Sequence, residues 1–274
     1  MVIQFTKMHG LGNDFVVIDL TKGGGNITPE QAQQIADRRR GVGCDQVLVM
    51  EKPVQAQADI FMRIYNPDGS EAGACGNGTR CVSALYMQQQ GLDHCMIETI
   101  SGLLPAKKVG DLIQVDMGEP RTRWDQIPLS RECDTLNLGI LHGRQTMTEP
   151  VAVNVGNPHT VFFVEDVAKV DVEKWGPEVE NHVLFPQRTN VEFAEILSPE
   201  KIRVRVWERG TGVTQACGSG ACATIVAAAR RGLTGRKVEI VLDGGSLLLE
   251  WRAEDNHILM MGPATYVFDG ILKS

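Results

Sequence analysis

The chain has 274 residues, of which 43% are hydrophobic and 22% are charged, and its formal net charge is −7. This composition is typical of a globular protein and excludes a disordered or fibrous chain. The net acidity argues against nucleic acid or an anionic membrane as the main partner.

The seven cysteines are an odd number and contain no CxxC pair, which argues against a disulfide framework and against a zinc ribbon. The first ten residues, MVIQFTKMHG, lack the apolar run of a signal peptide. No segment has the roughly 18 consecutive apolar residues that a membrane span needs. We therefore expect a cytoplasmic protein with reduced thiols and no membrane partner.

The predicted elements are mostly short strands separated by glycines. Strands are expected at 15–18 and 47–50, which are short apolar runs, and at 202–207, where apolar and polar residues alternate. A helix is expected between them, with Thr28 as its N-cap, proline in its first turn and an end near Arg40. Many strands and few helices predict an α+β fold.

An internal repeat divides the chain. Residues 60–78 read IFMRIYNPDGSEAGACGNG and residues 202–220 read IRVRVWERGTGVTQACGSG, with six identical positions at a constant offset of 142. Each copy continues into an apolar helix that ends at Gly-Leu, at 91–92 and at 232–233. These shared ends indicate a duplication into two halves of about 140 residues, with a boundary expected near 118–123.

In each copy a cysteine precedes Gly-x-Gly and the start of a helix. The first amides of a helix carry partial positive charge and no intrahelical partner, so they suit a carboxylate or a phosphate. The same field is expected to lower a thiol pKa from about 8.5 towards neutrality. Cys75 and Cys217 are therefore predicted acid–base groups.

One acid–base group in each half suits the inversion of a carbon centre. In such a reaction a proton leaves one face of the carbon and another proton arrives on the opposite face. This scheme needs no cofactor.

The remaining cysteines are predicted to fill space in the core, as most cysteines do. They are Cys44, Cys81, Cys95, Cys133 and Cys222.

Polar residues recur at nearly the same offset. Asn13 and Asn157 stand 144 residues apart, as do Gln46 and Asn190. Amides in loops are commonly turn formers, but their paired placement favours a role in ligand binding. Asn66 and Glu208 are 142 residues apart. Three residues lack a counterpart of the same kind in the first half, which suits an unsymmetrical substrate: His159, Glu208 and Arg209.

Several segments resemble the diaminopimelate epimerase family. They are KMHGLGNDF at 7–15, NPDGSE and ACGNGTRC within 66–81, GNPH at 156–159, and ERG with QACGSGACA within 208–223. The resemblance extends from residue 5 to the final Tyr-Val-Phe-Asp-Gly. It implies an isomerase that converts LL- to meso-diaminopimelate without pyridoxal phosphate, on the bacterial route to lysine and peptidoglycan.

The resemblance also implies a fold and a domain organisation. Each of two pseudo-symmetric halves is a curved, mostly antiparallel or mixed sheet wrapped around a central helix. The last strand returns to the first half, so the halves are expected at 1–117 plus 263–274 and at 118–262. The family is homodimeric, and no metal is implied.

By the same resemblance, Cys75 and Cys217 are the two acid–base thiols, and His159 and Glu208 assist them. The residues expected to cradle the reacting carboxylate are Gly76, Asn77, Gly218 and Ser219. The residues expected to hold the rest of the substrate are Asn13, Gln46, Asn66, Asn157, Asn190, Glu208 and Arg209. Two positions depart from the family pattern: Val213 stands where many members have an acidic residue, and Phe268 stands where many have tyrosine at the dimer contact.

Three alternatives remain at this point. The first is a cofactor-independent racemase of another amino acid, of the proline or hydroxyproline type. The second is a thiol redox or metal-binding protein, which the missing CxxC spacing argues against. The third is a non-catalytic binding module, which would leave the two repeated thiols unexplained.

Overall fold

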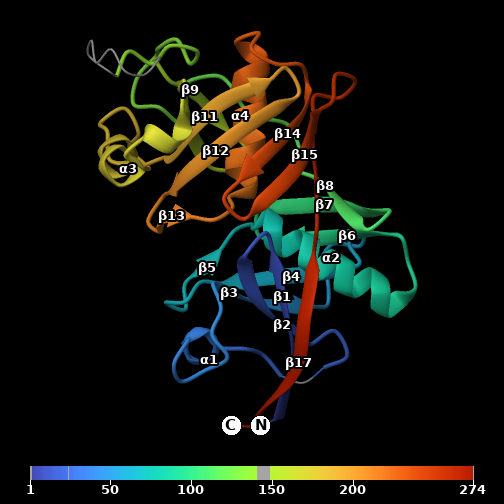
Figure 1. The fold of residues 1–274 in the computed structure, drawn as a ribbon. Coiled ribbons are helices and arrows are strands. Elements are labelled where there is room, and N and C mark those ends of the chain that lie inside the picture. The colour runs from blue at the N-terminus through green and yellow to red at the C-terminus, as the bar shows by residue number, and fades with distance from the viewer. Residues whose placement is uncertain (1, 24, 141–148, 274) are drawn as a thin grey trace. The chain divides into compact units, whose positions relative to one another are not determined.

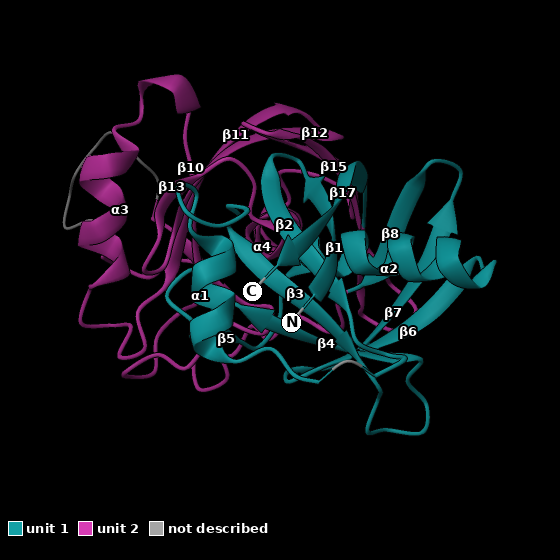
Figure 2. Cartoon of the chain, turned by 90° about the horizontal axis from the view of Figure 1, so that it is seen from below, with its two compact units in different colours: residues 1–116, 261–274 teal, residues 117–260 magenta. Residues whose placement is uncertain are grey.

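The computed structural model describes residues 2–23, 25–140 and 149–273 (Figure 1). The chain divides into two compact units, unit 1 with residues Met1–Asp116 and Met261–Ser274, and unit 2 with residues Met117–Met260 (Figure 2). The first boundary differs by one residue from that of the expected halves, and the second differs by two residues.

Unit 1 contains a mixed sheet and two helices. Its strands pair in the order β17-β1-β2-β3-β4-β6-β7-β8, and the pairs β2–β3 and β4–β6 are parallel. The short β5 pairs with β4. The bounds are β1 Val2–Gly10, β2 Asn13–Asp19, α1 Pro29–Ala36, β3 Gln46–Glu51, β4 Ile60–Tyr65, β5 Glu71–Ala72, α2 Gly76–Gln90, β6 His94–Thr99, β7 Gly102–Val109, β8 Leu112–Asp116 and β17 Thr265–Lys273.

Unit 2 has the same plan. Its strands pair in the order β9-β10-β11-β12-β14-β15, with β10–β11 and β12–β14 parallel, and β13 pairs with β12. The bounds are β9 Val151–Asn154, β10 Pro158–Phe163, the 3-10 helix η1 Val167–Lys169, α3 Val172–Glu180, β11 Asn190–Ser198, β12 Lys201–Glu208, β13 Gly212–Thr214, α4 Gly218–Arg230, β14 Lys237–Leu242, β15 Gly245–Trp251 and β16 Ile258–Gly262. Strand β16 continues past the unit boundary.

The strand register repeats between the units. On the parallel pair β2–β3, Phe15 lies opposite Gln46, and on β10–β11, His159 lies opposite Asn190. His159 stands 144 residues after Phe15, and Asn190 stands 144 residues after Gln46. The offset falls to 142 at β12 because the connection from β11 to β12 is shorter than that from β3 to β4. The α+β class and the duplication are therefore confirmed.

Each unit holds one helix against the concave side of its sheet. Helix α2 packs against β1, β2, β3, β6, β7 and β8, and α4 packs against β9, β10, β11, β14 and β15 (Figure 1). Helix α4 reads GSGACATIVAAAR, and its small and apolar side chains are buried from Ala221 to Ala228. Small side chains let the strands approach the helix on several sides. Within the described residues, no helix has the length and apolar character to cross a membrane.

Helix α1 begins as predicted but ends earlier. The Thr28 hydroxyl accepts a hydrogen bond from the Gln31 amide, and the Gln31 side-chain oxygen accepts one from the Thr28 amide, which completes a capping box. The predicted end near Arg40 is wrong, because Asp37 is extended with ψ 117°. Its carboxylate accepts the amides of Arg39 and Arg40 at 2.7 and 2.9 Å, so these amides bond to a side chain instead of extending the helix.

We expect Thr28→Ala to lower the free energy of unfolding by about 1 kcal/mol, because the first turn of α1 loses its cap. Urea denaturation at neutral pH measures this change. Thr28→Ser is the matched control, since its hydroxyl keeps the cap, and it should remain close to the wild type. Equal stability of the alanine and serine variants would contradict the capping argument.

Candidate active site

The two predicted thiols occupy the same structural position. Cys75 is the N-cap of α2 and Cys217 is the N-cap of α4, both in extended conformation. The Cys75 sulfur accepts the Gly78 amide at 3.4 Å, and the Cys217 sulfur accepts the Gly220 amide at 3.3 Å. Each sulfur thus takes one of the amides that a helix start leaves without an intrahelical partner. The residues that follow the thiols, Gly76 and Gly218, are the first residues of their helices.

Close packing explains the second glycine of each motif. A Cβ at Gly78 would lie 3.0 Å from a methyl group of Leu48 on β3. A Cβ at Gly220 would lie 2.8 Å from the Glu192 carboxylate on β11. In each unit the neighbouring strand therefore approaches the first helical turn closely. A side chain in place of either glycine would displace the strand residue that packs there.

In unit 1, Asn13 connects two parts of the site. The tight turn at 11–12, with φ of 56° and 84°, places Asn13 at the start of β2. Its Nδ2 donates to Asp45 at 2.9 Å, and its Oδ1 accepts from Asn77 at 3.2 Å. Asn77 in turn accepts from the fully buried Arg80 at 2.9 Å. Asn13 and Asn77, both predicted site residues, thus lie in contact.

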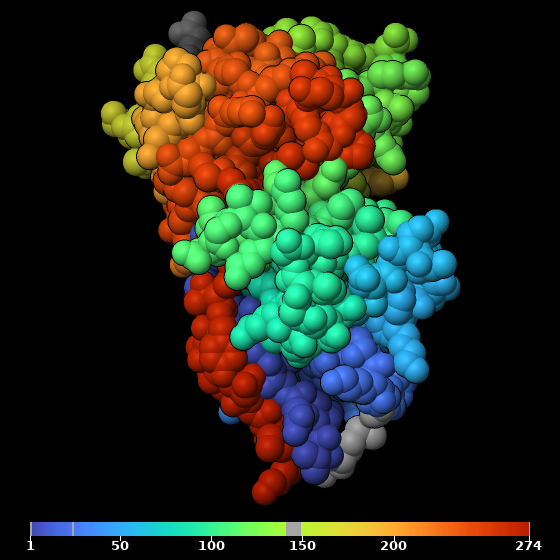
Figure 3. All heavy atoms as spheres, turned by 90° about the vertical axis from the view of Figure 1, so that its right-hand side faces the viewer, coloured from blue at the N-terminus to red at the C-terminus, as the bar shows by residue number. Residues whose placement is uncertain are grey.

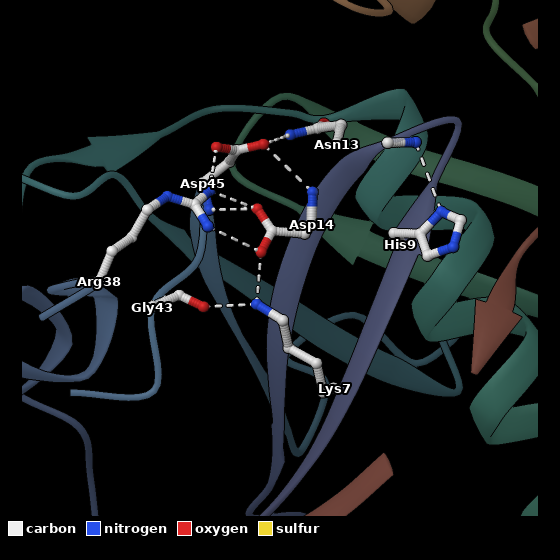
Figure 4. A network of polar contacts seen from close by, with 8 residues as sticks. Lys7, His9, Asn13, Asp14, Arg38, Gly43 and Asp45 are labelled. Atoms are coloured by element: carbon white, nitrogen blue, oxygen red, sulfur yellow. Dashed lines mark hydrogen bonds and ion pairs between the residues drawn. The ribbon is translucent and has the colours of Figure 1, made fainter. Parts of the chain in front are cut away.

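A charged network fixes the loop behind Asn13 (Figure 4). The Arg38 guanidinium donates to Asp14 at 2.6 Å and to Asp45 at 2.7 Å. The Lys7 ammonium donates to Asp14 at 2.5 Å and also to the Gly43 carbonyl. Partial burial would raise the pKa of Asp14, but the hydrogen bonds from Arg38 and Lys7 prevail and lower it to about 2.

Gln46 and Asn66 also lie together. Gln46 Nε2 donates to Asn66 Oδ1 at 3.0 Å, and Asn66 Nδ2 donates to Ser70 at 3.1 Å. Gln46 Oε1 is buried and has no hydrogen-bond partner among the described residues. A buried acceptor without a donor is costly, so it marks a place where a ligand donor would be favourable.

In unit 2, His159 lies between two oxygens. Its Nδ1 is 2.7 Å from Glu192 Oε1, and its Nε2 is 2.9 Å from Asn157 Oδ1. The side chains of His159 and Glu192 are both 0% exposed. Asn157 and His159 are predicted site residues, whereas Glu192 was not predicted.

Asn190 and Arg209 meet where β11 begins and β12 ends. Asn190 Oδ1 accepts the Arg209 amide at 3.0 Å, and Asn190 Nδ2 donates to the Pro158 carbonyl at 2.9 Å. The Arg209 guanidinium donates to the Gln187 carbonyl at 2.9 Å. Asn190 therefore fixes the backbone that carries Arg209.

The thiol of Cys217 lies among polar groups. Ser219 Oγ is 3.4 Å from its sulfur, and Thr214 donates to Glu208 Oε1 at 2.5 Å. Burial raises the pKa of Glu208. Burial, followed by the charges of Glu208 and Glu192, raises the pKa of Cys217 well above its usual range. The expectation of a lowered pKa is wrong for Cys217, because desolvation and two carboxylates outweigh the field of the helix.

The other cysteines fit their predicted role as space-filling residues. Cys44, Cys81, Cys95 and Cys222 are buried, and Cys133 is half-buried. Desolvation raises the pKa of Cys44 and Cys95 to about 11 and that of Cys81 to about 12, which keeps these thiols protonated and unreactive.

The chain matches the diaminopimelate epimerase family model over residues 5–123 and 151–267. A diaminopimelate epimerase of Rhodospirillum centenum is 53% identical over 274 residues, which are 100% of this chain and 93% of that protein. A diaminopimelate epimerase of Acidiphilium cryptum is 52% identical over 271 residues, or 98% of this chain and 96% of that protein. This chain belongs to the diaminopimelate epimerase family.

The fold is shared more widely than the family. A hydroxyproline epimerase structure from Agrobacterium vitis has a TM-score of 0.69 at 13% identity, and the match covers 99% of this chain and 92% of that chain. That likeness concerns the fold alone. The family assignment therefore does not favour the alternative of a proline or hydroxyproline racemase.

Two sets of residues that support the site were not predicted from the sequence. Asp45 and Arg38 hold Asn13 through contacts that no spacing reveals. Glu192 did leave a signal, because it stands 144 residues after Leu48, the offset that also relates Gln46 to Asn190. A carboxylate therefore replaces an apolar strand residue at the corresponding position.

We expect Asp14→Asn to lower the free energy of unfolding at pH 7 by roughly 2 kcal/mol, because Lys7 and Arg38 lose the carboxylate to which they donate. The folded-state pKa is depressed, so this contribution is present above the unfolded-state pKa near 4 and is lost as the pH falls towards 2. Chemical denaturation at pH 7 and pH 3 measures the difference, which should shrink at pH 3. Asp125→Asn, on an exposed pair with Arg123, should change stability little at either pH. A difference that does not depend on pH would contradict the assignment.

Proposed function

We propose that this chain converts LL-diaminopimelate to meso-diaminopimelate by proton transfer between two thiols, without pyridoxal phosphate. The observation that carries the proposal is the equivalent N-cap position of Cys75 and Cys217 on two duplicated central helices. Membership of the diaminopimelate epimerase family supplies the substrate.

In the proposed step, one cysteine as thiolate removes the α-proton from one face of the substrate. The electron pair of the C–H bond spreads into the adjacent carboxylate. The other cysteine, as thiol, then donates a proton to the opposite face, so the thiolate and the thiol exchange roles. The raised pKa of Cys217 supports its assignment as the thiol in the direction in which Cys75 is the base.

The carboxylate must be stabilised while it carries this charge. We assign the amides at the helix starts, those of Gly76, Asn77, Gly218 and Ser219, to that task. Preorganised donors of this kind each typically stabilise a transition state by ~3 kcal/mol. The helix field acts in the same direction.

The remaining predicted residues hold the rest of the substrate. Arg209 is a natural partner for a carboxylate. The open acceptor at Gln46 Oε1 suits an ammonium group. His159 and Glu208 assist the thiols. The amides assigned to substrate binding are Asn13, Asn66, Asn157 and Asn190.

Deuterium labelling tests substrate and reaction together. Incubation with LL-diaminopimelate in heavy water should place one deuterium on the α-carbon that is inverted, and meso product should appear at the same time. Mass spectrometry and chiral chromatography follow both. Absence of both label and meso isomer would reject the proposed function.

Replacement of either thiol separates the two-base scheme from other chemistry. Cys75→Ala and Cys217→Ala should each abolish turnover, since each variant lacks one of the two proton carriers. Cys133→Ala, at a half-buried position outside the motifs, is the control and should keep wild-type activity. Full activity in either motif variant would reject the scheme.

We also propose that the protein is a cytoplasmic homodimer that uses strand β17. This strand pairs with β1, and the red C-terminal segment of the chain lies at the surface in Figure 3. Apolar side chains of β17 are exposed, among them Tyr266 at 56%, Phe268 at 45% and Ile271 at 59%. Phe268 packs edge-on against Phe5, with ring centroids 6.0 Å apart, so its exposed side is held in a fixed position. An exposed apolar strand of this kind is typical of an interface.

We expect Phe268→Ala to shift the protein from dimer towards monomer, because the exposed apolar surface of β17 becomes smaller. Sedimentation velocity across a concentration series measures the dissociation constant. Val54→Ala is the control, since Val54 is an apolar side chain of unit 1 that is 87% exposed and lies outside β17. Equal dissociation constants for the Phe268 variant and the wild type would contradict the proposed interface.

A further inference from the structure

The duplication places a hydrogen-bonded polar pair in unit 2 where unit 1 has two apolar side chains. On β10 and β11, His159 and Glu192 occupy the positions that Phe15 and Leu48 occupy on β2 and β3. All four side chains are completely buried. The units thus share the backbone register and differ in the chemistry of the side chains that it carries.

Glu192 is tied to the start of α4 as well as to His159. Its Oε1 is 2.7 Å from His159 Nδ1 and lies so close to Gly220 that a Cβ there would be only 2.8 Å away. The amide of Gly220 donates to the sulfur of Cys217. In unit 1 the corresponding contact is the one between Leu48 and Gly78. The carboxylate therefore lies against the turn that carries one thiol, and an apolar side chain lies against the turn that carries the other.

This arrangement is costly for stability. Glu192 Oε2 is buried without a hydrogen-bond partner among the described residues. Burial of polar groups costs desolvation that an apolar pair of similar volume does not, and an unpartnered buried oxygen adds to this penalty. The positions of Phe15 and Leu48 show that the fold accepts apolar residues there.

The negative charge of Glu192 acts on Cys217. The carboxylates that act on this thiol come from two strands, Glu208 from β12 and Glu192 from β11, and both raise its pKa. His159 on β10 acts on Glu208 with the opposite sign. Removal of either negative charge therefore favours the thiolate of Cys217.

We propose that Glu192 is a positioning residue of the reaction, which fixes the His159 imidazole and places a buried carboxylate against the Cys217 turn, at the position where the apolar Leu48 lies against the Cys75 turn. The inference rests on the proposed function, because it assigns Cys217 to proton transfer. A carboxylate on Nδ1 orients the ring and leaves Nε2 directed at Asn157, one of the residues assigned to the substrate. The same carboxylate keeps Cys217 protonated before the substrate arrives.

Glu192→Gln tests the charge while it preserves the size of the side chain. The variant and the wild type are treated with iodoacetamide over a range of pH, and peptide mass spectrometry follows the carbamidomethylation of Cys217. The negative charge of Glu192 raises the pKa of the Cys217 thiol. Its removal should therefore shift the Cys217 midpoint, the pH at which the rate of Cys217 modification is half-maximal, to lower pH. This readout needs no substrate. The thiol-modification result is therefore independent of the epimerase assay on the wild type, and it is the epimerase assay that tests the proposed function.

Turnover gives the second readout. For Glu192→Gln we expect kcat to fall by roughly ten- to a hundred-fold, with less change in KM and with an altered pH profile of kcat/KM. A group that itself transfers the proton typically contributes ~10²–10⁴-fold. The loss expected for a positioning residue lies at or below the lower end of that range. Glu195→Gln is the matched control, since Glu195 lies on the same strand and on the opposite face, where it accepts the Val167 amide. This control should keep both the wild-type midpoint and the wild-type activity.

A double variant covers the case in which Glu192→Gln does not fold. His159→Phe/Glu192→Leu copies the apolar pair of unit 1, so we expect a thermal unfolding midpoint at or above that of the wild type. The Cys217 midpoint should again move to lower pH, and turnover should be lost. An unchanged Cys217 midpoint in a folded variant would overturn the proposal, and so would a loss of activity with an unchanged pH profile.

Discussion

The amides at the starts of α2 and α4 are the constraint on which the site depends. These amides have no partner within the helix, so a side chain, water or a ligand must take them. In both units a cysteine sulfur takes one of them. The capping requirement thus fixes the thiols at the same turns to which the proposed function assigns the reacting carboxylate.

The helix field alone does not determine the state of a capping thiol. At Cys217 the field favours the thiolate, but burial and two neighbouring carboxylates favour the thiol, and the latter effects prevail. Desolvation of a fully buried group shifts a pKa by up to several units, whereas the partial charge at a helix end is worth about 1 kcal/mol. Identical N-cap geometry therefore gives no guarantee of identical proton affinity.

The sequence was sufficient for the features that depend on periodicity and local chemistry. The repeat predicted a helix at each Cys-Gly-x-Gly motif, and α2 and α4 begin there. The offsets of 144 and 142 indicated the duplication, and the structure adds that the strands of the two units share a register. Thr28 and Pro29 predicted the start of α1 correctly, but its end depends on the conformation of Asp37 and on the amides that its carboxylate captures. Contacts such as that between Asn13 and Asp45 join residues whose separation has no periodic pattern. The pKa of Cys217 depends on burial, which no local pattern measures.

The replacement of an apolar pair by His159 and Glu192 also bears on how a symmetric fold performs this reaction. Inversion of a carbon centre asks for equivalent proton carriers on its two faces, and the duplicated N-caps supply that equivalence. Diaminopimelate also has a distal end, which must be held in one orientation while either face reacts, and this requires the two units to differ. Differences placed on the strands behind the turns, as at Leu48 and Glu192, alter the charge around a thiol without moving the backbone that caps it. The two thiols can therefore have equivalent N-cap geometry while their surroundings differ in charge. The geometry is set by the helix caps, and the charge is set by the side chains on the strands that pack against them.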